Sequence, residues 1–257
     1  MKNDCHLHLK KCDVGSIQRP KLICLPYAGG SQYVFTPWIQ ALEGRIDVIA
    51  PELPGRGRRI MEAPKTRLRD VVHWLSNELH DVLHGDFALW GHSMGALLAY
   101  ELARTLAANE RAMPRHLFLS GARPPQLPRH TERYHELDDA ALASKLSQMN
   151  GTPVEVLADS DLMALILPTV RADFAICETY HWHPDPHTLH VPMTVIGGDQ
   201  DPDIPVAKLQ GWRSCTNGPV SIIEMAGHHF FLRDQVEAIT DVLVETLISP
   251  TPLRTAG

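Results

Sequence analysis

The pentapeptide Gly-His-Ser-Met-Gly at residues 91–95 places a serine between two glycines, after an apolar run and before a run rich in alanine and leucine. A serine hydroxyl is a poor nucleophile unless it stands exposed beside a base, and a sharp strand-to-helix turn exposes it in this way. The flanking positions of such a turn must be nearly free of side chain, which Gly91 and Gly95 are. The amide of Met94 would lie at the positive end of the helix dipole, where an oxyanion is stabilised. The pattern therefore predicts that Ser93 is a catalytic nucleophile and that the Met94 N–H is an oxyanion donor.

A serine in this turn requires an acid and then a histidine later in the chain, each in a loop after a strand. Two loops meet this requirement, and their candidates are Asp199, Asp201 and Asp203 in the first and His228 and His229 in the second. Adjacent side chains diverge, so only one of the two histidines can reach Ser93. A further histidine, His92, lies inside the turn itself, where we expect it to pack rather than to react. The residue types alone leave the choice within each loop open.

The second oxyanion donor should come from the loop that follows the first strand. That loop is Pro-Tyr-Ala-Gly-Gly-Ser at residues 26–31, and its glycine pair allows backbone amides to turn inward. We expect the N–H of Ala28 to be this donor.

Short apolar runs that alternate with helical patterns must position these loops. The six runs lie at 21–25, 46–50, 87–90, 116–120, 193–197 and 221–225. Helices are expected near 37–42 and over 66–83, 94–108 and 235–247. This alternation predicts an α/β protein with a mostly parallel sheet and helices on both faces.

The alternation stops over residues 123–190, which carry helical patterns at 137–149, 154–167 and 169–180 but no convincing strand. An insertion of this length inside a domain is usually functional, so we expect a mobile helical lid. The predicted organisation is a loose tail (1–19), a first core part (20–122), the lid (123–190), a second core part (191–250) and a C-terminal tail (251–257).

Composition restricts the partners and the compartment. The 257 residues carry a formal net charge of -6 with scattered charges, which gives no basic surface for nucleic acid. No apolar run is long enough to span a membrane and no secretory signal begins the chain, so we expect a cytoplasmic protein without membrane association. The five cysteines are odd in number and widely spaced, which is typical of reduced thiols. The Cys and His residues among the first twelve are interpreted as tail residues rather than as a zinc site.

Several segments together resemble the type II thioesterases, the stand-alone editing hydrolases of polyketide and nonribosomal peptide synthesis. The resemblance covers residues 21 to about 247 and depends on Leu-Pro-Tyr-Ala-Gly-Gly at 25–30, Glu-Leu-Pro-Gly-Arg-Gly at 52–57, Gly-His-Ser-Met-Gly-Ala at 91–96, Gly-Asp-Gln-Asp-Pro at 198–202, Gly-Trp at 211–212 and Gly-His-His-Phe-Phe-Leu at 227–232. It implies an α/β-hydrolase fold with an inserted lid. The family motifs assign the acid to Asp201 and the catalytic histidine to His229, while His228 is an additional histidine that departs from the family pattern.

The resemblance implies hydrolysis of acyl thioesters on the phosphopantetheine arm of acyl or peptidyl carrier proteins. The serine chemistry needs no cofactor or metal, and we expect a monomer. Arg56, Arg58 and Arg59 could meet a phosphate or an acidic carrier surface, although a solvated basic loop is an equal alternative. Three other functions stay open: a chain-releasing thioesterase, a small-molecule carboxylesterase with the same catalytic residues, and a catalytically silent scaffold that binds carrier proteins.

Overall fold

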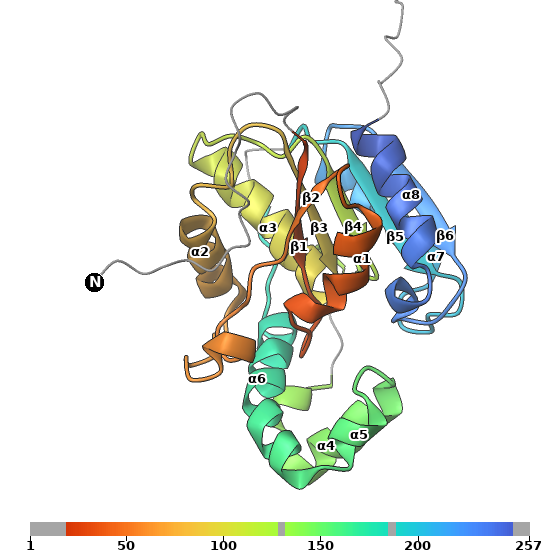
Figure 1. The fold of residues 1–257 in the computed structure, drawn as a ribbon. Helices are drawn as coiled ribbons and strands as arrows, with labels where there is room; N and C mark the ends of the chain where they lie inside the picture. Colours follow the sequence, from red (N-terminus) through yellow and green to blue (C-terminus); the bar gives the residue numbers. More distant parts are fainter. Residues whose placement is uncertain (1–18, 128–131, 185–188, 249–257) are drawn as a thin grey trace, which may run out of the picture.

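The computed structural model describes residues 19–127, 132–184 and 189–248, and its centre is one sheet of six parallel strands (Figure 1). The strands are β1 (Lys21–Leu25), β2 (Asp47–Ile49), β3 (Phe87–His92), β4 (Leu117–Ser120), β5 (Met193–Gly198) and β6 (Val220–Met225). Their order in the sheet is β2-β1-β3-β4-β5-β6, and every pair is parallel. The predicted fold class is confirmed, and the strands lie within two residues of the predicted apolar runs.

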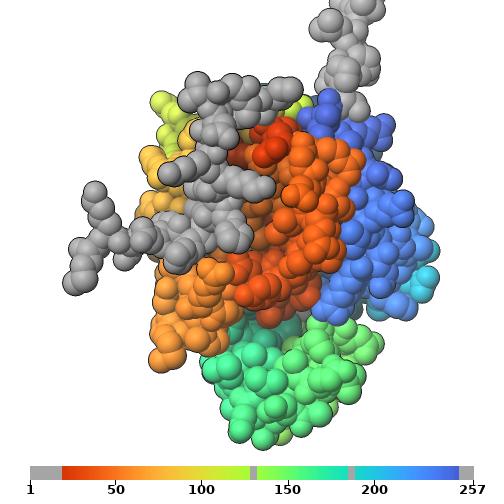
Figure 2. Space-filling view, viewed as in Figure 1, coloured from red at the N-terminus to blue at the C-terminus, as the bar shows by residue number. Residues whose placement is uncertain are grey.

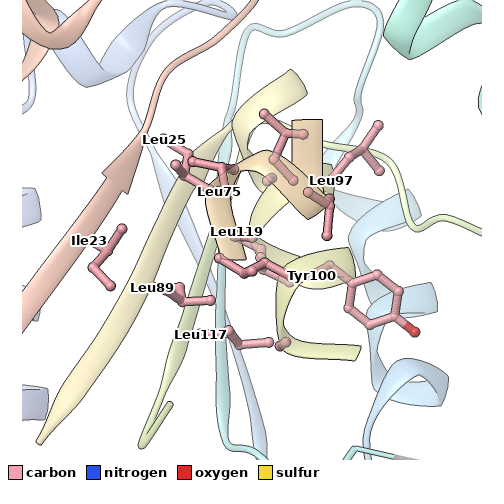
Figure 3. Packing of buried hydrophobic residues seen from close by; sticks show 14 of the residues in the cluster. Ile23, Leu25, Leu75, Leu89, Leu97, Tyr100, Leu117 and Leu119 are labelled. Carbon is pink, nitrogen blue, oxygen red and sulfur yellow. The ribbon is translucent and has the colours of Figure 1, made fainter. Parts of the chain in front are cut away.

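Successive residues of the inner strands face opposite sides of the sheet and build two separate cores. Ile23 and Leu89 belong to the cluster that packs against α2 (Leu68–Glu78) and α3 (Met94–Ala108), part of which Figure 3 shows. Leu22 and Trp90 belong to the second cluster, which includes residues of α1 (Thr36–Ala41) and α8 (Val236–Leu247). Helices therefore cover both faces of the sheet, and all strand C-termini meet at one edge.

A group of helices lies between β4 and β5, at the edge where the strands end (Figure 1). It consists of α4 (Asp139–Met149), α5 (Val154–Leu157) and α6 (Ser160–Glu178), with a small apolar core of its own that contains Leu142, Leu146, Met163, Leu167 and Val170. Figure 2 shows it in green and teal as a lobe against one end of the core. The predicted division into helices at 154–167 and 169–180 was wrong. The helical course is interrupted at Asp159, and a single helix then continues through Pro168.

The break and the continuity of α6 have local causes. Asp159 caps α6, since its carboxylate accepts hydrogen bonds from the amides of Asp161 and Leu162. Pro168 removes one internal hydrogen bond of the helix, but packing of its buried neighbours Leu167 and Thr169 holds the helical course. The division of the chain at residues 123 and 190 into core and lid stays a prediction.

A short α-helix, α7 (Val206–Leu209), follows the loop after β5. No helix in the described ranges combines the length and apolar character needed to cross a bilayer. Within the same ranges, no group of three His, Cys, Asp or Glu side chains is placed to hold a metal ion. Most of the two expected tails, with the cysteines and histidines of the first twelve residues, lies outside the described residues.

Candidate active site

Ser93 occupies a strained turn between β3 and α3. Its backbone has φ 56° and ψ -113°, a conformation that costs energy for a residue with a side chain and persists where the surroundings enforce it. A Cβ on Gly91 would lie 2.0 Å from the carbonyl oxygen of Gly95, and one on Gly95 would lie 2.1 Å from the carbonyl oxygen of Leu25. Both glycines are therefore required for the close approach of helix and sheet, as the sequence predicted, and the Ser93 hydroxyl projects from the turn.

The structure brings Ser93, His229 and Asp201 into one chain of hydrogen bonds, although 136 residues separate the serine from the histidine. His229 Nε2 lies 3.1 Å from Ser93 Oγ, and His229 Nδ1 lies 2.6 Å from Asp201 Oδ2. With a proton on Nδ1, the imidazole donates to the carboxylate and presents Nε2 as the acceptor toward the hydroxyl. This is the geometry in which a histidine can take the proton of a serine.

The Asp201 carboxylate is buried and held by several donors. Its Oδ1 accepts hydrogen bonds from the amides of Asp203 and Ile204 at 3.0 and 3.1 Å, while Oδ2 faces His229. Burial raises the pKa of this carboxyl, but the hydrogen bond and charge of His229 and the two amides outweigh that effect, so the net pKa lies below its ordinary value. Asp201 is thus an anion that can orient an imidazole and stabilise an imidazolium.

The other candidates of the two loops make different contacts. Asp199 Oδ1 accepts the amide of Gly227 at 2.8 Å and so ties the acidic loop to the histidine loop. His228 turns away, with Nδ1 2.9 Å from the carbonyl oxygen of Gln200, and the Asp203 side chain is exposed. These residues brace or border the loops and do not face Ser93.

His92 packs against the ring of His229. Its ring is buried, its Nδ1 lies 2.9 Å from Ser120 Oγ, and its centroid is 5.2 Å from that of His229. Burial, reinforced by the charge of His229, lowers the pKa of His92 well below its ordinary value, so this ring is neutral. It supports the ring of His229 as a packing residue.

In the loop after β1, both glycine amides already have hydrogen-bond partners. The Gly29 N–H donates to Asp173 Oδ2 at 2.7 Å, and the Gly30 N–H donates to the carbonyl oxygen of Tyr27 at 2.9 Å. Among the described residues, neither Ala28 nor Met94 uses its amide in a backbone hydrogen bond. Met94 directly follows Ser93 as the first residue of α3, and Ala28 lies in the loop after β1; the assignment of their amides as oxyanion donors stays a prediction.

The sequence reasoning missed two functional candidates, Asp173 and Arg233, and misjudged Arg56. Arg56 does not face a carrier surface, because it is 8% exposed and its guanidinium binds the carboxylate of Asp173 on α6. Arg59 contacts Glu62 and Glu78, which leaves Arg58 as the exposed member of the trio. The charge pattern of residues 56–59 carried no signal for this, because the acid that buries Arg56 lies 117 residues away.

The second missed candidate is Arg233, at the rim of the site. Its Nη2 donates to the Tyr27 hydroxyl at 2.6 Å and to the carbonyl oxygen of Gly151, in the turn between α4 and α5. Its guanidinium also lies 4.9 Å from the ring centroid of Phe230, the neighbour of His229. Arg233 therefore joins the histidine loop, the loop after β1 and the inserted helices.

Comparison with known proteins gives consistent matches over nearly the whole chain. A family model described as a thioesterase domain matches residues 20–246. The gramicidin S biosynthesis protein GrsT of Aneurinibacillus migulanus is 36% identical over 91% of this chain and 91% of its own length. The human medium-chain S-acyl fatty acid synthase thioesterase is 30% identical over 83% of this chain and 81% of its own. The structure of the type II thioesterase BorB, from the borrelidin biosynthetic cluster, superposes with a TM-score of 0.82 at 36% identity and covers 89% of this chain and 93% of BorB.

Proposed function

This chain belongs to the thioesterase family and is a thioester hydrolase related to the type II thioesterases, and from that premise we propose that Ser93, His229 and Asp201 are its catalytic triad. The observation that carries the proposal is the continuous hydrogen-bonded chain from Ser93 Oγ through His229 to the buried Asp201 carboxylate. The amides of Met94 and Ala28 are proposed as the oxyanion hole.

In the first half of the reaction, Ser93 Oγ attacks the carbonyl carbon of an acyl thioester while His229 Nε2 takes the hydroxyl proton. Negative charge develops on the former carbonyl oxygen, where the N–H groups of Met94 and Ala28 stabilise it. The tetrahedral intermediate collapses by breaking its carbon–sulfur bond, and the thiol leaves with the proton from His229. Ser93 then carries the acyl group as an ester.

In the second half, His229 Nε2 removes a proton from a water molecule, whose oxygen attacks the ester carbonyl. The second tetrahedral intermediate uses the same two amides and expels Ser93 Oγ, which recovers its proton from His229. The products are the free acid and the restored enzyme. Asp201 stabilises the imidazolium in both halves through its hydrogen bond to Nδ1.

We propose that the substrate is an acyl group on the phosphopantetheine arm of an acyl or peptidyl carrier protein, and that the reaction clears misprimed or stalled intermediates. The basis is the similarity to GrsT, named as a gramicidin S biosynthesis protein, and to BorB, the type II thioesterase from the borrelidin biosynthetic cluster. Chain release is the second candidate, favoured by the similarity to the medium-chain fatty acid synthase thioesterase. A cytoplasmic, monomeric protein that needs no cofactor is part of the same proposal.

The experiment compares one acyl group on three thiols: a loaded carrier protein, coenzyme A and N-acetylcysteamine. Binding energy from a remote carrier surface can orient the thioester, so kcat/KM is expected to be highest on the carrier and lowest on the short thiol. The Ser93→Ala variant should lose on the order of 10³ or more in turnover on all three. Equal kcat/KM on the carrier and the short thiol would refute carrier recognition, whereas full activity of Ser93→Ala would refute the serine mechanism. Hydrolysis of mischarged acyl groups in preference to the mature chain separates editing from chain release.

A further inference from the structure

The ion pair between Arg56 and Asp173 is buried and lies directly behind the loop that follows β1. The two side chains are 9% and 1% exposed, and the guanidinium binds the carboxylate through two bonds, Nη2 to Oδ1 at 2.8 Å and Nη1 to Oδ2 at 2.9 Å. Such a fork fixes the relative orientation of both planar groups. Charged pairs are seldom buried to this degree, which raises the question of what this one holds in place.

Both members of the pair bind the backbone of the loop itself. Asp173 Oδ2 accepts the amide of Gly29 at 2.7 Å, and Arg56 Nη1 donates to the carbonyl oxygen of Gly30 at 2.8 Å. The Gly29 amide belongs to the peptide unit that begins at Ala28, the expected oxyanion donor. A displacement of Asp173 therefore moves the peptide adjacent to the donor N–H.

The loop also packs closely against α6 at Gly29. Gly29 has φ +75°, and a Cβ there would lie 3.1 Å from Val170 Cγ2, on the same helix one turn before Asp173. A second contact of α6 with the core lies further from the loop, where the Thr169 hydroxyl donates to the carbonyl oxygen of Gly55. Of the two residues, Asp173 binds the loop after β1 and Thr169 binds the backbone at Gly55.

We infer that Arg56 and Asp173 are positioning residues that set the Ala28 N–H at the oxyanion site and couple the placement of α6 to the chemical step. The inference rests on the proposed serine mechanism and extends it to a helix of the inserted segment. Neither side chain touches the substrate in this assignment, and both act through the backbone of Gly29 and Gly30.

The first test is the Asp173→Asn variant, which keeps the shape of the side chain and one of its two oxygens. One oxygen cannot serve both the Gly29 amide and the whole Arg56 fork, and the new amide group meets donors in either orientation. Because misplacement by about 1 Å can cost 10²-fold and loss of a whole oxyanion donor 10² to 10³-fold, kcat is expected to fall about 10- to 100-fold. KM should stay within about threefold, since ground-state binding does not use the hole. Arg56→Lys, which keeps the positive charge, should lose less of the wild-type kcat than Arg56→Met.

The matched control is Thr169→Val, which removes the hydrogen bond from α6 to the Gly55 carbonyl oxygen without touching the loop after β1. Its kcat is expected to stay close to that of the wild type even where its melting temperature falls. A loss of kcat in Thr169→Val as large as in Asp173→Asn would mean that general docking of α6, rather than the ion pair, is what matters, and would overturn the inference.

A second experiment reports directly on the hydrogen bonds at the proposed oxyanion site. A fluorophosphonate that labels Ser93 places its phosphoryl oxygen at the oxyanion site, so the labelling rate and the ³¹P resonance of the adduct report the hydrogen bonds there. Asp173→Asn is expected to label 10- to 100-fold more slowly, with a shifted ³¹P resonance, while Thr169→Val matches the wild type. Labelling of Asp173→Asn at the wild-type rate with an unshifted resonance would overturn this inference alone. A wild-type protein that is not labelled at Ser93 would overturn the proposed nucleophile, and the inference with it.

The double variant Arg56→Met/Asp173→Leu keeps the test decisive if single variants fold poorly. It removes both charges together, so no unpaired charge is left buried and the melting temperature should return toward the wild-type value. Labelling should nevertheless remain slow, because nothing then binds the Gly29 amide. Recovery of the wild-type labelling rate in this folded double variant would refute a positioning role.

Discussion

Replacement of Asp201 by asparagine should abolish most activity through the tautomer of His229, and the structure predicts the direction of the new amide. Oδ1 of Asp201 receives two backbone amides, those of Asp203 and Ile204, while Oδ2 faces His229. The asparagine oxygen can satisfy both amides only by taking the place of Oδ1. Its NH2 group then points at His229 Nδ1 as a donor.

An imidazole that accepts at Nδ1 carries its proton on Nε2, toward Ser93. That tautomer cannot take the hydroxyl proton, although the side chains overlay those of the wild type. The same substitution in a well-studied serine protease lowers turnover by about 10⁴, and a loss of this order is expected here. At about 1.36 kcal/mol per decade, this corresponds to roughly 5 kcal/mol of transition-state stabilisation.

The assay is release of free thiol from an acyl-N-acetylcysteamine, with the melting temperature measured in parallel. Asp199→Asn and Asp203→Asn are the matched controls: the first keeps an acceptor for the Gly227 amide and the second changes an exposed side chain, so both should stay within about tenfold of the wild type. In Asp201→Asn, NMR of ¹⁵N-labelled histidine should show the proton moved from Nδ1 to Nε2. Asp201→Asn with more than a tenth of wild-type turnover, or Asp199→Asn as the most damaged variant, would refute the reasoning.

Three further outcomes follow from individual contacts. His229→Ala should lose on the order of 10³ or more in kcat while His228→Ala keeps a near-normal rate, because only the first faces Ser93; steady-state kinetics of both decides, and the reverse ranking would exchange their roles. Hydrogen exchange should be faster in α4 and α5 than in α3, and Arg233→Met should accelerate it further by removing the bond to the Gly151 carbonyl; equal protection throughout would indicate a rigid wall. Burial, assisted by the charge of Arg115, lowers the pKa of His116 from 6.5 to about 4, so its contribution to stability is complete above pH 6.5 and is lost as the pH falls toward 4. Urea unfolding should therefore show that the free energy of unfolding falls more between pH 7.5 and pH 5 for the wild type than for His116→Gln, and equal decreases would contradict the lowered pKa.

The residues that sequence reasoning placed correctly owe this to local constraints. A Cβ on Gly91 would meet the backbone of Gly95, four residues on, so this half of the turn around Ser93 is dictated within one short segment, whereas a Cβ on Gly95 would meet the carbonyl oxygen of Leu25 in β1. The parallel sheet then follows from six apolar runs, and parallel strands deliver their C-terminal loops to a common edge. For the choice of Asp201 and His229 within their loops, the residues alone were insufficient, and the motif resemblance supplied it.

The features that sequence reasoning missed depend on long-range packing. Arg56 resembles a surface charge in its own segment, and Asp173 resembles a solvent-facing residue of an amphipathic helix. Only their mutual burial, across 117 residues, shows that they bind each other and the loop after β1. The division of α6 was misjudged for a related reason: proline lowers helix propensity by about 3 kcal/mol at one position, but packing along the whole buried face of a helix can exceed that cost.

Two of the contacts that attach the inserted helices to the core, the Arg56–Asp173 pair and the bonds of Arg233, differ in strength, and this asymmetry predicts where any opening begins. Breaking the buried pair of Arg56 and Asp173 would leave a charge without compensation, at a cost of about 3–5 kcal/mol. Arg233 is exposed, and water can replace its bonds to Tyr27 and Gly151 at a cost of about 1 kcal/mol or less. Opening should therefore begin at the turn between α4 and α5 and pivot about α6. On this reasoning the loop that carries Ala28, held by Asp173 and Arg56, keeps its position during such an opening, so the proposed oxyanion hole would stay assembled.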